Sequence, residues 1–189
     1  MIAASAALHS FPALAADEKK PAPKKAAASE TFDQDSVLRD AEAFFGKGAE
    51  GLGKVIEKAF KENGRPNGYI KGEEAAGAIT VGLIYGNGTL ILKNAKNRHV
   101  WWSGPSIGFD LGANASKVFV LVYNMRQPGS LFQRFPAVDG SFYYVGGVGI
   151  NYQRRDKIVL APIRLGVGLR AGASIGYVHY TPKKTYNPF

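Results

Sequence analysis

The chain has 189 residues, of which 46% are hydrophobic, with a formal net charge of +9 and no cysteine. This length and composition fit one domain with a buried core. The absence of cysteine excludes a disulfide framework, a thiolate nucleophile and a zinc-thiolate site.

The positive charge is unevenly distributed. Residues 1–74 carry 11 Lys or Arg against 12 Asp or Glu, whereas the rest of the chain carries 13 against three. A basic surface of this kind favours anionic partners such as phospholipid head groups, lipopolysaccharide or acidic polymers. Solubility alone explains a basic composition equally well, so the charge does not by itself define a site.

The N-terminus predicts export. Residues 1–15 are uncharged and small or apolar, and Ala13-Leu14-Ala15 has the small-x-small form that signal peptidase cleaves, although a basic segment is missing before it. Residues 16–30 are rich in Lys, Pro and Ala and predict a flexible linker. We therefore expect a periplasmic protein, free or peripherally attached to a membrane, without a nucleic-acid partner.

Residues 31–66 predict one N-terminal helix. Asp33 or Asp35 is available as the N-cap, and apolar residues recur at three- and four-residue steps to form one stripe. Glycines at positions 46, 48, 51 and 53 interrupt the pattern. They indicate a kink or a very close approach of the backbone to the surface on which the helix packs.

Residues 67–189 carry period-two patterns that predict strands separated by Gly, Asn and Pro. A hairpin turn is expected at Tyr85–Gly88, where Asn-Gly occurs, and a loop at Gly72–Gly77. A short helical turn is expected at Leu131–Phe135. The expected strands are Ile79–Ile84, Thr89–Lys93, His99–Ser103, Ser106–Asp110, Lys117–Asn124, Ser141–Tyr152 and Ile158–Tyr180.

The last of these segments alternates apolar residues with glycines and two arginines, Arg164 and Arg170. Its length predicts two strands, or one strand bent at the glycines. The fold class is therefore mainly β: a small antiparallel closed β-barrel of about eight strands with the N-terminal helix packed on it, in one folded domain over 31–189. Short strands and Pro182 and Pro188 disfavour a transmembrane barrel.

No motif predicts catalysis. Two G-x-S-x-G matches, at 104–108 and 172–176, lack the helix that follows a nucleophile elbow. His99 and His179 have no second ligand at metal-binding spacing, and Glu73 and Glu74 are adjacent on the chain, so their side chains should point apart. We expect a non-enzymatic protein without catalytic residues, metal or cofactor.

Four residues are candidates for ligand binding. Trp101 and Trp102 should face opposite sides of their strand, so one of them is expected at the rim or surface, where it could meet lipid or sugar. Arg164 and Arg170 are the best candidates for binding an anion. The alternative for the arginines is structural pairing with Asp139 or Asp156.

At these motifs the chain resembles the EipA (envelope integrity protein A) family of alphaproteobacterial periplasmic proteins. The resemblance implies a periplasmic small β-barrel with an N-terminal helix that supports envelope integrity and stress resistance, with no established ligand or catalytic residue. The matching stretches are Phe44-Phe45-Gly46, Pro66-Asn67-Gly68-Tyr69-Ile70, Gly72-Glu73-Glu74, Trp102, Gly104-Pro105-Ser106-Ile107-Gly108-Phe109-Asp110, Leu121-Val122-Tyr123-Asn124, Val145-Gly146-Gly147, Pro162-Ile163-Arg164, Gly166-Val167-Gly168 and Asn187-Pro188-Phe189.

A weaker similarity, from Gly104-Pro105 through Leu121-Val122-Tyr123-Asn124 to the glycine-alternating strand, is to the SYLF domain, which binds lipids. The alternative function is therefore an anionic lipid- or lipopolysaccharide-binding module of the periplasm.

Overall fold

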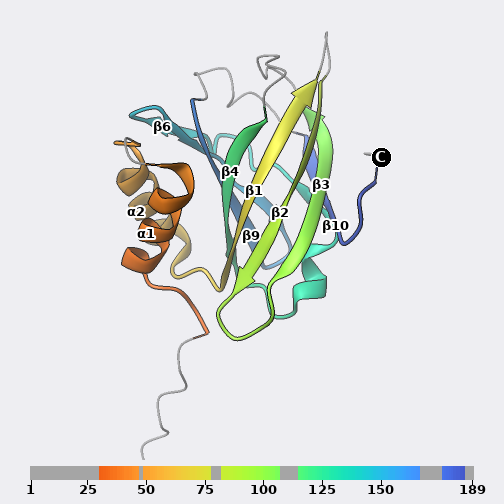
Figure 1. Cartoon of the computed structure of the whole chain (residues 1–189), viewed down its shortest axis with the longest axis horizontal. Coiled ribbons are helices and arrows are strands. Elements are labelled where there is room, and N and C mark those ends of the chain that lie inside the picture. The colour runs from red at the N-terminus through yellow and green to blue at the C-terminus, as the bar shows by residue number, and fades with distance from the viewer. Residues whose placement is uncertain (1–29, 47–48, 78–81, 107–114, 167–175, 186–189) are drawn as a thin grey trace, which may run out of the picture.

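The structure is a computed structural model that describes residues 30–46, 49–77, 82–106, 115–166 and 176–185. Two helices stand on one side of a strongly curled antiparallel sheet (Figure 1). The elements are α1 (Gln34–Phe45), α2 (Leu52–Asn63), β1 (Gly68–Gly77), β2 (Gly82–Leu92), β3 (Arg98–Ser106), β4 (Ser116–Tyr123), a 3-10 turn (Pro128–Leu131), β5 (Arg134–Pro136), β6 (Tyr143–Val145), β7 (Val148–Ile150), β8 (Gln153–Arg155), β9 (Ile158–Leu165) and β10 (Tyr177–Thr181).

The helical region is two helices, so the prediction of one helix over 31–66 is wrong. Asp33 caps α1 as expected, accepting a hydrogen bond from the Ser36 amide at 2.9 Å. Gly46 ends α1 with φ +98°, a conformation that other residues rarely adopt. Gly51 precedes α2, and a Cβ there would overlap the Val145 carbonyl oxygen. The close backbone approach predicted from the glycines is therefore confirmed at Gly51.

The sheet has the strand order β5-β10-β3-β2-β1-β4-β9-β7-β6, and β7 and β8 share the same edge of β9. The mainly β, antiparallel fold is confirmed, but a closed barrel is not. Among the described residues, the backbones of the two sides of the curl meet at an isolated bridge between Ala137 and Gln153 and at a hydrogen bond from the Val138 amide to the Tyr152 carbonyl at 2.9 Å. A side-chain hydrogen bond from Arg155 Nη1 to the Arg134 carbonyl, at 3.3 Å, also crosses the seam. The fold is a curled half-barrel whose seam lacks a full ladder.

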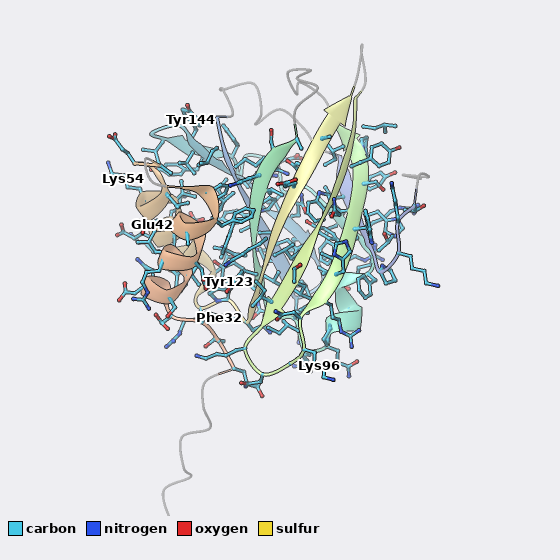
Figure 2. All side chains as sticks on the ribbon, viewed as in Figure 1. Phe32, Glu42, Lys54, Lys96, Tyr123 and Tyr144 are labelled. Carbon is cyan, nitrogen blue, oxygen red and sulfur yellow. The ribbon has the colours of Figure 1, made fainter. Side chains whose placement is uncertain are left out.

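Two hydrophobic cores lie on the two faces of the curled sheet. Alternate residues of the strands point into the concave interior, and their neighbours on β1, β4 and β9 point outward under the helices. Figure 2 shows side chains filling both the interior and the space beside α1 and α2. Buried members of the interior core are Ile70, Ile84, Leu90, Val100, Trp102, Val118, Val120, Val122, Met125, Leu131, Phe135, Ile158, Leu160, Val178 and Tyr180.

The helix-covered core explains the amphipathic stripe found in the sequence. Val37 and Ala41 of α1 and Val55, Ile56 and Ala59 of α2 are all fully buried. They pack against outward residues of the sheet, including Phe119, Leu121, Tyr123, Val159, Ala161 and Ile163. The central strands therefore bury both of their faces, and the helices are an integral part of the fold.

Two local predictions in the sheet are wrong. Residues 85–88 form no turn, because β2 runs without a break from Gly82 to Leu92. The stretch 72–77 is no loop, because it belongs to β1 and pairs with β2. The glycines there serve packing: a Cβ at Gly86 would overlap the Trp102 indole, and one at Gly72 would lie 2.6 Å from its Cη2 atom.

The C-terminal segment contains two strands, which is one of the two alternatives that its length predicted. β9 pairs with β4, whereas β10 lies between β3 and β5. Most of the glycine-alternating stretch, residues 167–175, lies outside the described residues. Among the described residues, Gly51 of the helical region lies against Val145 and Gly146 at the turn between β6 and β7.

Candidate functional site

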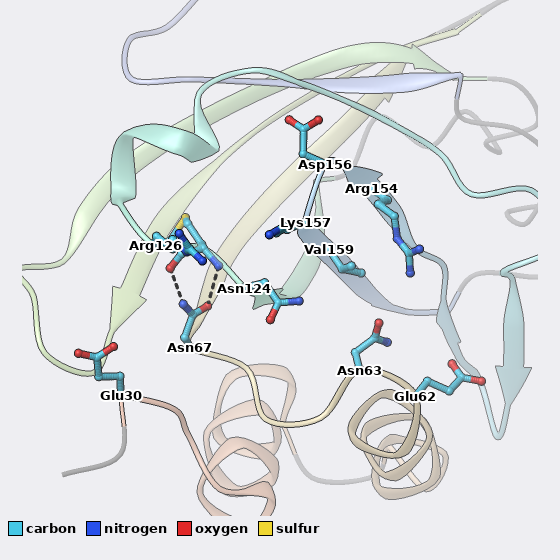
Figure 3. Close-up of a pocket in the computed structure, with 11 residues that line it drawn as sticks. Glu30, Glu62, Asn63, Asn67, Asn124, Arg126, Arg154, Asp156, Lys157 and Val159 are labelled. Carbon is cyan, nitrogen blue, oxygen red and sulfur yellow. Dashed lines mark hydrogen bonds between the residues drawn. The ribbon is translucent and has the colours of Figure 1, made fainter. Parts of the chain in front are cut away.

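A polar groove of about 730 Å³ opens where the end of α2 meets the edge of the sheet at which β1 begins and β4 ends (Figure 3). It lies between the C-terminus of α2, the chain before β1, the loop after β4 and the turn between β8 and β9. The side chains that line it are Glu30, Glu62, Asn63, Asn67, Asn124, Met125, Arg126, Arg154, Asp156, Lys157 and Val159.

Asn67 holds the loop that carries Arg126. Its side-chain amide donates to the Met125 carbonyl, and its Oδ1 accepts from the Met125 amide at 3.3 Å, as the dashed lines in Figure 3 show. Asn124, the residue before Met125, has φ +59°, a left-handed conformation that asparagine tolerates better than most residues. These contacts turn the chain sharply out of β4 and place Arg126 on the wall of the groove.

The turn between β8 and β9 supplies the opposite wall. Arg155 and Ile158 are cross-strand partners, so Asp156 and Lys157 alone make the turn, and Asp156 takes φ +52°. In Figure 3 the Asp156 carboxylate points away from Asn67 while the Lys157 ammonium points toward the side that carries Arg126.

One carboxylate of the groove, that of Glu62, is already paired within the protein. Glu62 forms an i,i+4 ion pair with Lys58, and its other oxygen accepts from the Tyr152 hydroxyl at 2.6 Å. The hydrogen bond from Lys58, followed by that from Tyr152, lowers the pKa of Glu62 below its ordinary value. Glu62 therefore stays ionised and engaged within the α2 wall.

Unlike Glu62, the cations of the groove are not paired with carboxylates of the described residues. Arg126, Arg154 and Lys157 are all exposed. The groove is thus lined by three cations and by two further carboxylates, Glu30 and Asp156, and the Asn124 side chain adds a neutral amide. The arrangement suits a ligand that is both anionic and rich in hydrogen-bond acceptors.

A second polar cluster lies inside the sheet. Arg164, 6% exposed, forms a two-point ion pair with Glu74, 4% exposed, in which Nε donates to Oε1 and Nη2 donates to Oε2 at 3.2 Å. Trp102 Nε1 donates to the same Oε2 at 3.3 Å, and Arg164 Nη1 donates to Asn151 Oδ1 at 3.1 Å. Burial opposes the charge on Arg164, but Glu74 outweighs burial and raises the pKa of the guanidinium.

The four residues singled out in the sequence do not form one site. Arg164 is directed inward and pairs with Glu74, rather than with Asp139 or Asp156, so it is not placed to meet an external anion. Trp102 joins the same buried cluster, whereas Trp101 lies on the opposite, outer face of β3, as predicted. Arg170 lies outside the described residues.

Sequence reasoning missed the groove cations Arg126, Arg154 and Lys157. They come from two separate turns, and only the excess of positive charge after residue 74 pointed toward them. It also missed the role of Glu74, although the prediction that Glu73 and Glu74 point apart is confirmed, since Glu73 is exposed and Glu74 buried.

The described residues contain no group of three metal-ligating side chains and no helix with the length and apolar character of a membrane span.

Comparison with known proteins identifies the family of this chain. A family model described as envelope integrity protein A matches residues 30–189. The chain belongs to the EipA family. It is also similar to the crystal structure of a beta-barrel-like, uncharacterized protein from Brucella abortus, with 45% sequence identity and a TM-score of 0.79, over 85% of this chain and 100% of that one.

The comparison with curated protein sequences found no match. The resemblance to the EipA family that the sequence motifs indicated is confirmed, and the family is named for the integrity of the cell envelope. The similarity to SYLF domains stays a prediction.

Proposed function

We propose that this EipA-family protein is a non-enzymatic periplasmic protein that supports the integrity of the cell envelope and its resistance to stress. The family description supports the envelope role. The one buried ion pair of the described residues, Glu74 with Arg164, supports a structural rather than catalytic use of the buried charges, because each charge is satisfied by the other and by neighbouring side chains. Export rests on residues 1–15 of the sequence.

Within this role, the groove binds the anionic groups of the envelope, either phosphate head groups of glycerophospholipids or the phosphates of lipopolysaccharide. The observation that carries this proposal is the set of exposed cations Arg126, Arg154 and Lys157, which converge on one groove without ion-pair partners among the described residues. An exposed cation near an anionic surface contributes roughly 1 kcal/mol to binding.

Cosedimentation with vesicles tests this binding. One set of vesicles contains phosphatidylethanolamine with phosphatidylglycerol, a second contains lipopolysaccharide, and a third is neutral. We expect binding to one or both anionic sets that weakens with added salt, because salt screens exposed charges. The set that binds identifies the source of the anion, and absence of salt-sensitive binding to either would contradict the proposal.

The double variant Arg126→Gln, Arg154→Gln should weaken vesicle binding by about 30-fold, or roughly fivefold for each charge. The matched control is Arg39→Gln with Lys54→Gln, which removes two exposed helix cations that do not line the groove. Equal losses in the two variants would show that net charge, rather than the groove, drives binding.

Complementation of a strain that lacks the gene tests the cellular role. Wild-type protein should restore resistance to detergent, and a chain without residues 1–15 should not, because it stays in the cytoplasm. Glu73→Gln, which removes an exposed carboxylate of the kind often used in catalysis and lies outside both proposed binding surfaces, should complement fully. Loss of complementation by this variant at normal protein level would contradict a non-enzymatic function.

A further inference from the structure

Strands β2, β3 and β10 lie beyond β1 in the curled sheet, away from the part that the helices cover (Figure 1). We call their outward-facing surface the outer face of β2, β3 and β10. Its side chains are those that alternate with the interior core residues Ile84, Trp102 and Tyr180. None of the outward residues of β3 or β10 belongs to the helix-covered core. This part of the sheet therefore presents a face that the helices leave uncovered.

Cross-strand pairing arranges this face in rows. Trp101 is the partner of Asn87 on β2 and of Thr181 on β10. In the next row Ser103 is the partner of Tyr85 and of His179. Aromatic rings thus alternate with small polar side chains, a pattern unlike that of either hydrophobic core.

A pocket of about 200 Å³ lies over the first row. Its walls include Trp101 and Tyr85, both half-buried, and the exposed side chain of Asn87. The segment after β10 supplies a further wall, with Lys184 Nζ 5.9 Å from the centre of the Trp101 ring. This volume is below the roughly 300–1,000 Å³ of sites for drug-sized ligands, so it suits one small ring of a longer molecule.

The chemistry of the face selects among ligand classes. An acyl chain needs a continuous apolar surface, but here Asn87, Thr181 and Lys184 interrupt it. A pyranose ring has an apolar face of C–H bonds and a rim of hydroxyl groups. It therefore matches a flat indole with amide and hydroxyl groups beside it, since tryptophan offers a large apolar surface at a polar boundary.

We propose that the outer face of β2, β3 and β10 is a glycan-binding site, in which one sugar ring stacks on Trp101 and its hydroxyl groups bond to Asn87 and Thr181. This site is distinct from the groove between α2 and the β8–β9 turn, and it does not depend on anion binding there. Together the two sites give the protein one surface for a phosphate and another for a sugar chain of the envelope.

Nuclear magnetic resonance of the nitrogen-15-labelled protein tests the proposal, because the two tryptophans of the chain give two indole N–H signals. The Trp101→Phe variant assigns them. The probes are glycan strands released from peptidoglycan and, separately, lipopolysaccharide oligosaccharide without its lipid, so that the two sources are distinguished. Oligothymidine is the comparison ligand. We expect at least one glycan to shift the Trp101 signal while the signal of the buried Trp102 stays in place.

Trp101→Ala should weaken glycan binding by roughly tenfold or more, and Asn87→Ala should weaken it without removing any ring. Tyr144→Ala, which removes an exposed aromatic side chain on β6, is the matched control and should bind as wild type. Added salt and the double variant Arg126→Gln, Arg154→Gln should leave glycan binding unchanged, so failure of the groove and of this face are separable. The proposal is overturned if neither glycan shifts the Trp101 signal, if Trp101→Ala binds as wild type, or if only oligothymidine binds.

Discussion

The indole of Trp102 occupies the space that a side chain at Gly86 would need. Because Gly86 and Trp102 are cross-strand partners on β2 and β3, the ring lies over the neighbouring strand and reaches Gly72 on β1. A large aromatic side chain and two glycines on successive strands therefore form one packing unit inside the half-barrel.

Gly86→Ala should destabilise the protein by about 1–3 kcal/mol, because the added methyl group overpacks a rigid ring. Urea unfolding measures the free energy of unfolding directly. The control is Gly53→Ala in α2, where no described atom beyond the adjoining helix backbone lies within 4 Å of the added Cβ. That change should be neutral or stabilise by up to about 1 kcal/mol, because alanine favours helix. Equal effects at both positions would contradict the packing explanation.

Glu74→Gln should cost about 3–5 kcal/mol, because it removes the buried carboxylate that pairs with the buried guanidinium of Arg164. Thermal or urea unfolding checks this value. Its control is the adjacent Glu73→Gln, whose side chain is exposed on the other face of β1 and should change stability by less than about 0.5 kcal/mol. A small effect at Glu74 would mean that Arg164 finds another partner.

Tyr123→Phe should stabilise the protein by about 1 kcal/mol, because the Tyr123 hydroxyl is buried under the helices and has no hydrogen-bond partner among the described residues. The contrasting variant is Tyr69→Phe on β1. The Tyr69 hydroxyl donates to Asp40 on α1 at 2.6 Å, so its removal should cost about 0.5–1.5 kcal/mol. Opposite signs for two identical chemical changes would confirm the assignment, whereas equal signs would contradict it.

Acid should destabilise the protein partly through His179. Burial, followed by the nearby Arg134, lowers the pKa of His179 below its ordinary value of 6.5. As pH falls through about 6.5, the unfolded chain therefore binds a proton that the folded protein resists, and the free energy of unfolding decreases. His179→Asn should show a smaller decrease between about pH 7 and pH 5 than wild type. Parallel curves for the two proteins would exclude this contribution.

The sequence predicted the parts of the fold that rest on periodicity. The helical stripe and the strand at Lys117–Asn124 follow from the apolar periodicity of the sequence. The length of the last segment left open two strands or one bent strand, and the structure has two. The turn expected at 85–88 failed because Asn-Gly is a local preference, whereas Gly86 and Gly88 lie where β1, β2 and Trp102 approach closely. Tertiary packing in this case outweighs turn chemistry.

The candidate binding surfaces were less predictable. Arg164 stood out because it interrupts a glycine-rich strand, but its partner Glu74 lies 90 positions away in the chain, and no local pattern connects them. Arg126 and Lys157 come from different turns and meet only because β4 and β9 are neighbours. Trp101 could be assigned to a surface from alternation alone, but its row with Asn87 and Thr181 depends on the register of three strands.

The position of β10 between β3 and β5 has a consequence for how the chain reaches its folded state. Synthesis runs from the N-terminus, so β3 and β5 emerge long before residues 177–181, and each must wait with one edge unpaired. An unpaired strand edge is a template for pairing with another chain. The last strand therefore acts as a closing element, and a chain that stops before it leaves open the edges through which nascent molecules aggregate.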